Sequence, residues 1–286
     1  MGARSTRWLV GAMLVVLALG CAAPPGAQRE RQSDCADVGS PSLMGTSGIS
    51  YGPHVAQVAE LLPACTDEAV GTIMFLPGGG YTELQRGMVH DPNVRRLRDQ
   101  GWVVLIVDYR LAPLYQWPAQ GSDVRRAIQW WRTTGAARWG APSAPLVGLG
   151  WSAGGHLSEW ATVREDGPVF DAGVSVAGGT YWPERLDRDA AIALLGINPS
   201  TARQLDASTV PHLDADDPRL LHVHARNDSI VAVRQAELLA ARVEEHGDPS
   251  VHRVVIDDTC GHSLRCLTPE RIDPFLAEVL VSHDEG

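Results

Sequence analysis

The sequence lacks any block of basic residues. Its 286 residues carry 24 basic and 34 acidic side chains, which gives a formal net charge of −10. Nucleic-acid binding depends on clustered basic side chains that face the phosphate backbone, so this charge balance argues against that class of partner. The chain also lacks internal repeats, and 44% of its residues are hydrophobic. Intrinsic disorder is therefore excluded for the bulk of the chain.

A long apolar run is missing too, since no segment after the N-terminus approaches the roughly 20 residues of a membrane-spanning helix. Residues 1–20 combine Arg4 and Arg7 with a short apolar core and no acidic residue, the layout of a secretory signal. Cys21 follows at once and resembles the lipidated cysteine of a bacterial lipoprotein, with ordinary cleavage near Gly20 as the alternative. We therefore expect an exported protein that is lipid-anchored through Cys21, or otherwise periplasmic or secreted.

The rest of the chain reads as a flexible tether, residues 21–34, and one domain, residues 35–286, because no second linker interrupts it. Within this domain, short apolar runs bounded by turn residues alternate with helix-like stretches. That alternation predicts an α/β fold, with a mostly parallel central sheet and helices on both faces. The expected strands are 71–76, 102–107, 146–149, 172–177, 220–225 and 251–256, and the expected helices are 91–100, 121–133, 155–164, 233–245 and 269–281.

A G-x-S-x-G motif, residues 150–155 (GWSAGG), lies between an expected strand and an expected helix. This is the context of a nucleophile elbow, in which Ser152 stands on a tight turn with its hydroxyl exposed. The flanking glycines remove side-chain atoms that would clash with the neighbouring strand and helix. The backbone N–H of Ala153 then points to where an oxyanion would form.

A serine nucleophile needs a base, and the base needs an acid that orients it. Asp228 and then His262 follow successive expected strands, so both lie at carboxyl ends in the chain order that such an elbow requires. Two other acids, close in sequence to the base, remain rivals: Asp257 and Asp258. Two further histidines alternate within an expected strand and are expected to pack or face solvent rather than react: His222 and His224.

A second glycine-rich loop, residues 77–81 (PGGGY), follows an early expected strand. Such a loop lets backbone N–H groups approach a substrate carbonyl without obstruction. A plain turn is one alternative, and a phosphate loop is another. The phosphate loop is disfavoured because neither a Lys-Ser/Thr pair nor G-x-G-x-x-G is present. No metal or organic cofactor is implied.

Four segments, taken in order, resemble the α/β-hydrolases of the hormone-sensitive-lipase-like and acetyl-esterase-like group: residues 76–81, 107–119, 150–157 and 207–228. The resemblance implies an α/β-hydrolase fold and a catalytic triad of Ser152, Asp228 and His262. It also implies three backbone oxyanion donors: the N–H groups of Gly79, Gly80 and Ala153.

Two positions depart from that group's pattern. Pro77 replaces the usual histidine, whose side chain helps to hold the oxyanion loop. Trp151 replaces the aspartate that precedes the serine in many lipase-like members. The segment around the serine is closer to the branch that contains carbohydrate-acetyl and feruloyl-type esterases. Both departures leave the substrate, rather than the catalytic class, open.

Residues 181–217 form a long insertion that we interpret as a small helical cap over the site, with an ordinary crossover as the alternative. Three aromatic residues are candidates to line a substrate pocket, although packing in the core is the favoured interpretation for any one of them: Tyr81, Trp151 and Trp182.

The expected function is that of a serine carboxylic-ester hydrolase, which works through an acyl-enzyme on short-chain or carbohydrate-linked esters. Its partner would be a small-molecule or glycan-linked ester. Three alternatives stay open: an amidase or peptidase with the same triad, a long-chain lipase, and a non-catalytic surface binding protein on the same fold.

The five cysteines are an odd number, and setting Cys21 aside for lipid or cleavage leaves four. In an oxidising compartment these four can form two disulfides, with three possible pairings. We predict Cys35–Cys65 and Cys260–Cys266. The second bond would close a short ring around His262 and so help to position the base.

Overall fold

The computed structural model describes residues 46–164, 166–167, 169–184 and 188–284. The predicted signal and tether, including Cys21, and the cysteine at position 35 lie outside these residues. In the described part of the chain, no helix is both long and apolar enough to cross a lipid bilayer.

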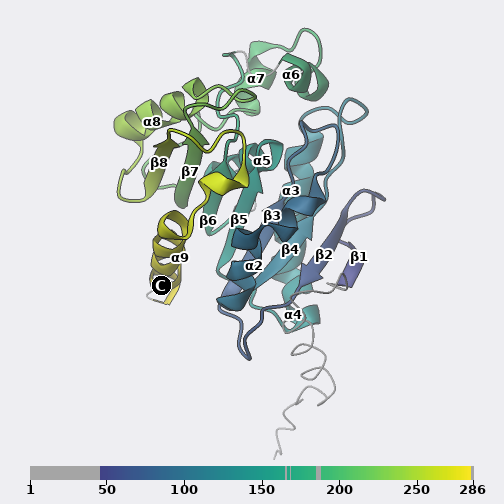
Figure 1. Ribbon diagram of the computed structural model, residues 1–286. Coiled ribbons are helices and arrows are strands. Elements are labelled where there is room, and N and C mark those ends of the chain that lie inside the picture. The colour runs from purple at the N-terminus through teal and green to yellow at the C-terminus, as the bar shows by residue number, and fades with distance from the viewer. Residues whose placement is uncertain (1–45, 165, 168, 185–187, 285–286) are drawn as a thin grey trace, which may run out of the picture.

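The described residues form one eight-stranded sheet. Its strands are β1 (Thr46–Ser50), β2 (Val58–Leu62), β3 (Gly71–Leu76), β4 (Trp102–Val107), β5 (Leu146–Trp151), β6 (Ala172–Val176), β7 (Arg219–Ala225) and β8 (His252–Asp257). Their spatial order is β1-β2-β4-β3-β5-β6-β7-β8 (Figure 1). Strands β3 to β8 are parallel, while β2 is antiparallel to both of its neighbours. The mostly parallel sheet predicted from the sequence is confirmed.

Helices cover both faces of the sheet, as predicted. The α-helices of the described residues are α2 (Pro92–Asp99), α3 (Ala119–Trp130), α4 (Ala136–Trp139), α5 (Ala153–Val163), α6 (Arg188–Leu195), α7 (Thr201–Asp206), α8 (Arg234–His246) and α9 (Pro269–Asp284). Helices α2 and α9 pack on one face, where Leu97 and Phe275 belong to the same hydrophobic core as side chains of the strands. Helices α3, α5 and α8 pack on the other face through residues such as Ile128, Leu157 and Leu239.

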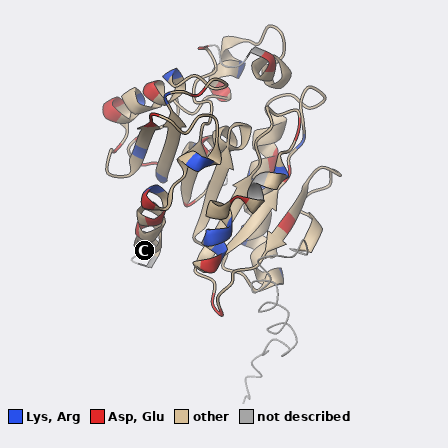
Figure 2. Ribbon diagram, in the orientation of Figure 1, with Lys and Arg blue, Asp and Glu red and all other residues tan. Residues whose placement is uncertain are grey.

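The four central strands follow from their composition. Every residue of β3, β4, β5 and β6 is buried, and none is charged. Such runs suit strands that are covered on both faces. Figure 2 shows charged residues along the outer helices and loops instead, including α2, α8 and α9.

The sequence analysis missed β1 and β2. Strand β1 is mostly exposed, and β2 alternates between partly and fully buried positions, so neither reads as a continuous apolar run. Other differences are at element ends. The helix expected at 121–133 begins at Ala119 and passes into a π-helical turn, Trp131–Gly135. The last expected strand is shifted by one residue, to His252–Asp257.

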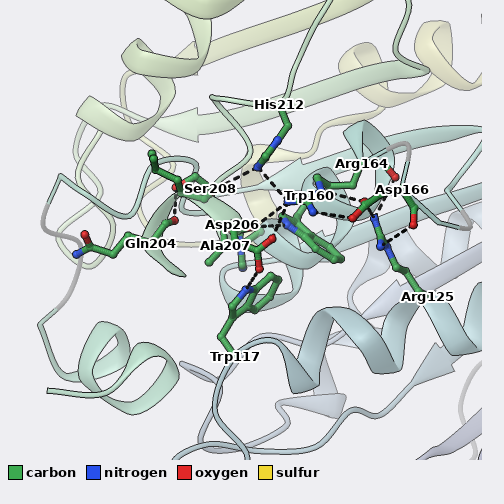
Figure 3. A network of polar contacts seen from close by, with 12 residues as sticks. Trp117, Arg125, Trp160, Arg164, Asp166, Gln204, Asp206, Ala207, Ser208 and His212 are labelled. Atoms are coloured by element: carbon green, nitrogen blue, oxygen red, sulfur yellow. Dashed lines mark hydrogen bonds and ion pairs between the residues drawn. The ribbon is translucent and has the colours of Figure 1, made fainter. Parts of the chain in front are cut away.

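Helices α6 and α7 belong to the predicted insertion and lie beyond the carboxyl ends of the strands (Figure 1). A polar network fastens α7 to the body of the domain (Figure 3). The Asp206 carboxylate accepts from Trp117 Nε1 at 2.7 Å and from Arg164 at 3.0 Å. The Asp206 carbonyl accepts from Trp160 Nε1 at 2.8 Å. Trp117 and Trp160 are both buried in the core, so their hydrogen bonds to Asp206 hold α7 in a fixed place against the domain.

Candidate active site

Ser152 stands between β5 and α5 on a sharp turn. Its backbone has φ +56° and ψ −119°, a region that costs an L-residue on the order of 1–3 kcal/mol. The surrounding structure imposes this conformation: the Ser152 N–H donates to Val176 O at 2.8 Å. The turn also needs Gly154, where a Cβ atom would lie 1.9 Å from Leu76 O. Gly154, two residues after the serine, therefore permits the close approach of α5 to β3.

His262 connects Ser152 to Asp228. Its Nδ1 lies 2.7 Å from Asp228 Oδ2, and its Nε2 lies 2.9 Å from Ser152 Oγ. A carboxylate can only accept, so Nδ1 donates, and in the neutral ring Nε2 accepts the serine hydroxyl proton. The three side chains come from the loops after β5, β7 and β8, which meet at the carboxyl edge of the sheet. The structure thus brings the three predicted residues together with the orientation of a nucleophile, base and acid.

Asp228 is held by four contacts. Its Oδ1 accepts from the N–H groups of Ile230 at 2.8 Å and Val231 at 2.9 Å. Its Oδ2 accepts from His262 and lies 3.6 Å from His224 Nε2. Burial by itself would raise the pKa of Asp228, but the hydrogen bonds from His262 and the two backbone N–H groups outweigh it and lower the pKa. The carboxylate therefore stays ionised.

The two rival acids do not contact the base. Asp257 pairs with Arg271 at 2.5 Å and accepts from the N–H of Thr259. The bond from Arg271 is the main reason that the pKa of Asp257 is lowered to about 2. Asp258 is exposed and pairs with Arg226 at 3.1 Å.

A cavity of about 300 Å³ opens beside Ser152 and His262. The three predicted oxyanion donors are among the residues that line it, and within the described residues their N–H groups donate to no other group. These donors are Gly79, Gly80 and Ala153. The φ angle of Gly79 is +129°, which side-chain-bearing residues rarely adopt. The glycine loop therefore lines the same cavity as Ser152, and its N–H groups have no other partner among the described residues.

The glycine loop is anchored by two tyrosines. Tyr109 donates its hydroxyl hydrogen bond to Pro77 O at 2.6 Å. The hydroxyl of Tyr81 lies 2.8 Å from His156 Nδ1, and His156 Nε2 lies 2.6 Å from Ala207 O. Because a carbonyl only accepts, Nε2 of His156 carries the proton and Nδ1 accepts from Tyr81.

His156 is a residue to which the sequence analysis gave no role, although it lies within segment 150–157, one of the four that carry the family resemblance. Trp182 Nε1 points at His156 Nε2 from 3.3 Å, but the shorter contact to Ala207 O decides the tautomer. Burial lowers the pKa of His156 to about 4, against a smaller opposite effect of the Ala207 bond. The ring is thus neutral at pH 7 and joins the glycine loop to the nucleophile helix.

The three predicted pocket aromatics all border the cavity and are all buried. Tyr81 and Trp182 belong to the core on one face of the sheet and Trp151 to the core on the other. The Trp151 ring lies 5.1 Å from the His262 ring, between centroids. Both interpretations from the sequence therefore hold at once: each residue packs in a core and also forms part of the pocket wall.

The sequence analysis did not find the rest of the wall, because these residues come from loops and helix ends without a motif. Two of these residues are polar, and Gln85 Nε2 donates to Glu83 at 2.6 Å. Three others are apolar: Ala190, Ile230 and Val231. The cavity lining thus combines polar and apolar side chains.

Cys260 and Cys266 form a disulfide that brackets His262, as predicted, with an S–S distance of 2.04 Å. Cys65 is also disulfide-bonded, and its partner is not among the described cysteines. The predicted Cys35–Cys65 pair stays a prediction. Among the described residues, no cluster of three His, Cys, Asp or Glu side chains could hold a metal ion.

Comparison with known proteins identifies a family model, a curated relative and two solved structures that are similar to this chain. A family model named BD-FAE matches residues 61–181. The probable carboxylic ester hydrolase LipM of Mycobacterium tuberculosis is 30% identical over 238 residues, which cover 74% of this chain and 55% of that protein. The chain therefore spans about half the length of this curated relative.

Two solved structures share the fold. A truncated carbohydrate esterase from gut microbiota aligns with a TM-score of 0.74 at 20% identity, over 85% of this chain and 99% of that one. A thermophilic esterase of the planctomycete Thermogutta terrifontis, bound to propionate, aligns with a TM-score of 0.65 at 19% identity, over 86% of this chain and 94% of that one.

Proposed function

Because the chain has the α/β-hydrolase fold, we propose that it is a serine carboxylic-ester hydrolase that works through an acyl-enzyme. One observation carries this proposal: Ser152, His262 and Asp228 form a continuous hydrogen-bonded series, and Ser152 and His262 line a cavity together with the glycine loop. An acyl-transfer site needs these parts in this arrangement.

The reaction follows from the geometry. His262 takes the proton of the Ser152 hydroxyl as Oγ attacks the ester carbonyl, and Asp228 stabilises the imidazolium that forms. The N–H groups of Gly79, Gly80 and Ala153 hold the oxyanion, a contribution of about 3 kcal/mol per donor. The imidazolium then protonates the alcohol that leaves. A water molecule, deprotonated by His262, attacks the acyl-enzyme and releases the acid and the free serine.

Short-chain or carbohydrate-linked esters are the proposed substrates. A cavity of about 300 Å³ lies at the small end of ligand sites, which suits a short acyl group better than a long chain. The solved Thermogutta terrifontis esterase was obtained with propionate and with butyrate. The gut-microbiota structure with the same fold is a carbohydrate esterase. Both similarities support the proposal, although neither assigns this protein's substrate.

A panel of acetyl, butyryl, feruloyl and long-chain esters, with matched amides, tests the proposal. We expect turnover of the short esters, and a fluorophosphonate probe should label Ser152. Faster cleavage of the amides would indicate an amidase or peptidase, and preference for long chains with interfacial activation would indicate a lipase. An unlabelled serine with no turnover would indicate a non-catalytic binding protein.

We further propose that the protein is exported and, through Cys21, anchored to a membrane by lipid. Residues 1–21 carry this proposal, and the disulfide between Cys260 and Cys266 fits an oxidising compartment. Cell fractionation of the full chain and of a Cys21→Ser variant tests it. Recovery of both in the same soluble fraction would contradict the anchor.

A further inference from the structure

A buried chain of ionisable side chains lies behind the triad, and the mechanism above does not use it. Glu159, His222 and His224 are all fully buried. Glu159 Oε2 lies 2.8 Å from His222 Nδ1, and His222 Nε2 lies 3.1 Å from His224 Nδ1. His224 Nε2 lies 2.8 Å from Val231 O. The chain therefore runs from α5 across β7 to the loop that carries Asp228.

The number of protons shared by the side chains of Glu159, His222 and His224 follows from the geometry of their contacts. A backbone carbonyl can only accept, so His224 Nε2 carries a proton and donates it to Val231 O. The three contacts need three protons, one in each, whereas a carboxylate and two neutral imidazoles carry only two. Glu159, His222 and His224 therefore hold one extra proton together, and their net charge is zero.

The extra proton belongs to the contact between Glu159 and His222. Burial, followed by the neighbouring His222, lowers the pKa of His224 to about 4, so this ring is neutral. Its Nδ1 then accepts from His222 Nε2, which leaves its single hydrogen on Nε2. A carboxylic acid with a neutral imidazole, or a carboxylate with an imidazolium, fits the Glu159–His222 contact equally. Both forms fix the tautomer of His224 in the same way.

We propose that Glu159 and His222 are positioning residues for the acid of the triad, a role that rests on the proposed esterase function. The His224 N–H holds the carbonyl of Val231, whose own N–H donates to Asp228 Oδ1 at 2.9 Å. The same His224 nitrogen faces Asp228 Oδ2 from 3.6 Å. These contacts thus fix the loop that carries Asp228. They also place the N–H of His224 behind the Asp228 carboxylate, so the charge of Glu159 does not face it directly.

The position of Glu159 links this series of buried contacts to the nucleophile. Glu159 lies on α5, the helix that begins directly after Ser152. The polar contacts therefore run from the nucleophile's helix to the acid, and the triad returns from the acid to the nucleophile. Packing alone does not need such a chain, since apolar side chains of similar volume would fill the space without the cost of burying charge.

The double variant Glu159→Leu with His222→Leu removes the pair without stranding a buried charge. His224 then loses the donor that fixes its tautomer, and the loop of Asp228 loses its support. We expect kcat for a short ester to fall by about 10- to 100-fold, because displacing a reacting group by about 1 Å can cost on the order of 100-fold. KM and the melting temperature should stay close to those of the wild type.

Two further variants make the test specific. Glu159→Gln keeps an N–H that can donate to His222 Nδ1, so it should recover most of the activity that the double variant loses. Ser158→Ala is the matched control, because Ser158 is also buried on α5 and its Oγ has no partner among the described residues. It should react at the wild-type rate.

Nitrogen-edited NMR of the histidine side chains tests the proton count without any substrate, so failure of this inference is distinguishable from failure of the proposed function. His224 should be neutral with hydrogen on Nε2 in the wild type and in Glu159→Gln. Wild-type kcat in the folded double variant would overturn the proposal. So would hydrogen on His224 Nδ1, or Glu159→Gln activity as low as that of the double variant. If the double variant does not fold, the spectra and the Gln variant decide.

Discussion

Tyr81 and His156 join the glycine loop to the nucleophile helix through one buried hydrogen bond of 2.8 Å. Pro77 stands where the hydrolases that this sequence resembles place a histidine whose side chain helps to hold this loop, and proline has neither a polar side chain nor a backbone N–H. In this protein the loop is held further along, by the side chain that follows the last glycine. The proposed oxyanion donors are thus placed relative to Ser152 by a contact between their two segments.

Tyr81→Phe should therefore lower kcat more than it raises KM. The variant removes a donor and leaves His156 Nδ1 buried without its partner, which costs about 1–3 kcal/mol of stability. The loosened loop should lower kcat by about 10-fold, less than loss of a whole oxyanion donor. Steady-state kinetics and urea unfolding measure both effects. Tyr115→Phe is the control, since that hydroxyl bonds His54 and does not border the cavity. Equal losses in both variants would refute the role of Tyr81.

Ser152→Ala should abolish hydrolysis of short p-nitrophenyl esters and labelling by a fluorophosphonate, while the fold survives. The hydroxyl is the proposed nucleophile, so its removal should lower the rate by about 10⁴-fold or more. Circular dichroism and the melting temperature check that the variant is folded. Undiminished turnover in a folded variant would exclude Ser152 from the mechanism.

Asp228→Asn should lower kcat by about 10⁴-fold, because the amide nitrogen would favour the wrong tautomer of His262. Nδ1 of the ring would then accept from the amide, and Nε2 would carry the hydrogen that prevents it from taking the serine proton. Asp258→Asn is the control, since Asp258 is exposed and pairs with Arg226. A similar rate loss in both variants would contradict the assignment of Asp228 as the acid of the triad.

Stability should fall as the pH is lowered from about 6.5 to about 4. Burial is the main reason that the pKa values of His156 and His224 are lowered to about 4 in the folded state. Between the folded-state pKa of about 4 and the unfolded-state pKa of about 6.5, the unfolded chain binds more protons than the folded chain. The free energy of unfolding therefore rises with pH across this window. Each ring contributes up to about 3 kcal/mol. Urea unfolding at several pH values measures the slope, and His156→Gln should flatten it. An unchanged slope in that variant would contradict the effect of this ring.

Replacing Cys260 and Cys266 together by serine should lower kcat several-fold, since the disulfide brackets His262. The ring is short, so the loss of stability from the freed chain should be small, about 2 kcal/mol or less. Kinetics and the melting temperature of the double variant test this. Full activity with unchanged melting would show that the bond does not help to position the base.

Much of the fold follows from the order of residues. The apolar runs of β3 to β6 are unbroken because both faces of these strands are covered, and this pattern is visible without coordinates. Strands β1 and β2 were missed because β1 is mostly exposed at the edge of the sheet and β2, beside it, is only partly buried, so neither forms a continuous apolar run. The choice of Asp228 over Asp257 and Asp258 was favoured by chain order, but the contact with His262 is a tertiary fact.

The interpretation of two histidines shows the limit most clearly. His222 and His224 were expected to pack or face solvent, and they do lie in the core, yet they also join Glu159 to the loop of Asp228. No spacing reveals such a contact, because Glu159 lies 63 positions before His222 in the chain.

By itself, the sequence determined the parallel sheet, the turn that carries Ser152 and the order of serine, acid and base. These depend on local composition and on the rule that parallel strands end at one edge. Tertiary structure alone decided which acid meets His262, which side chains hold the glycine loop, and where the buried protons reside. The physical reason is that hydrogen bonds and burial depend on distances between segments far apart in the chain, which composition and periodicity do not encode.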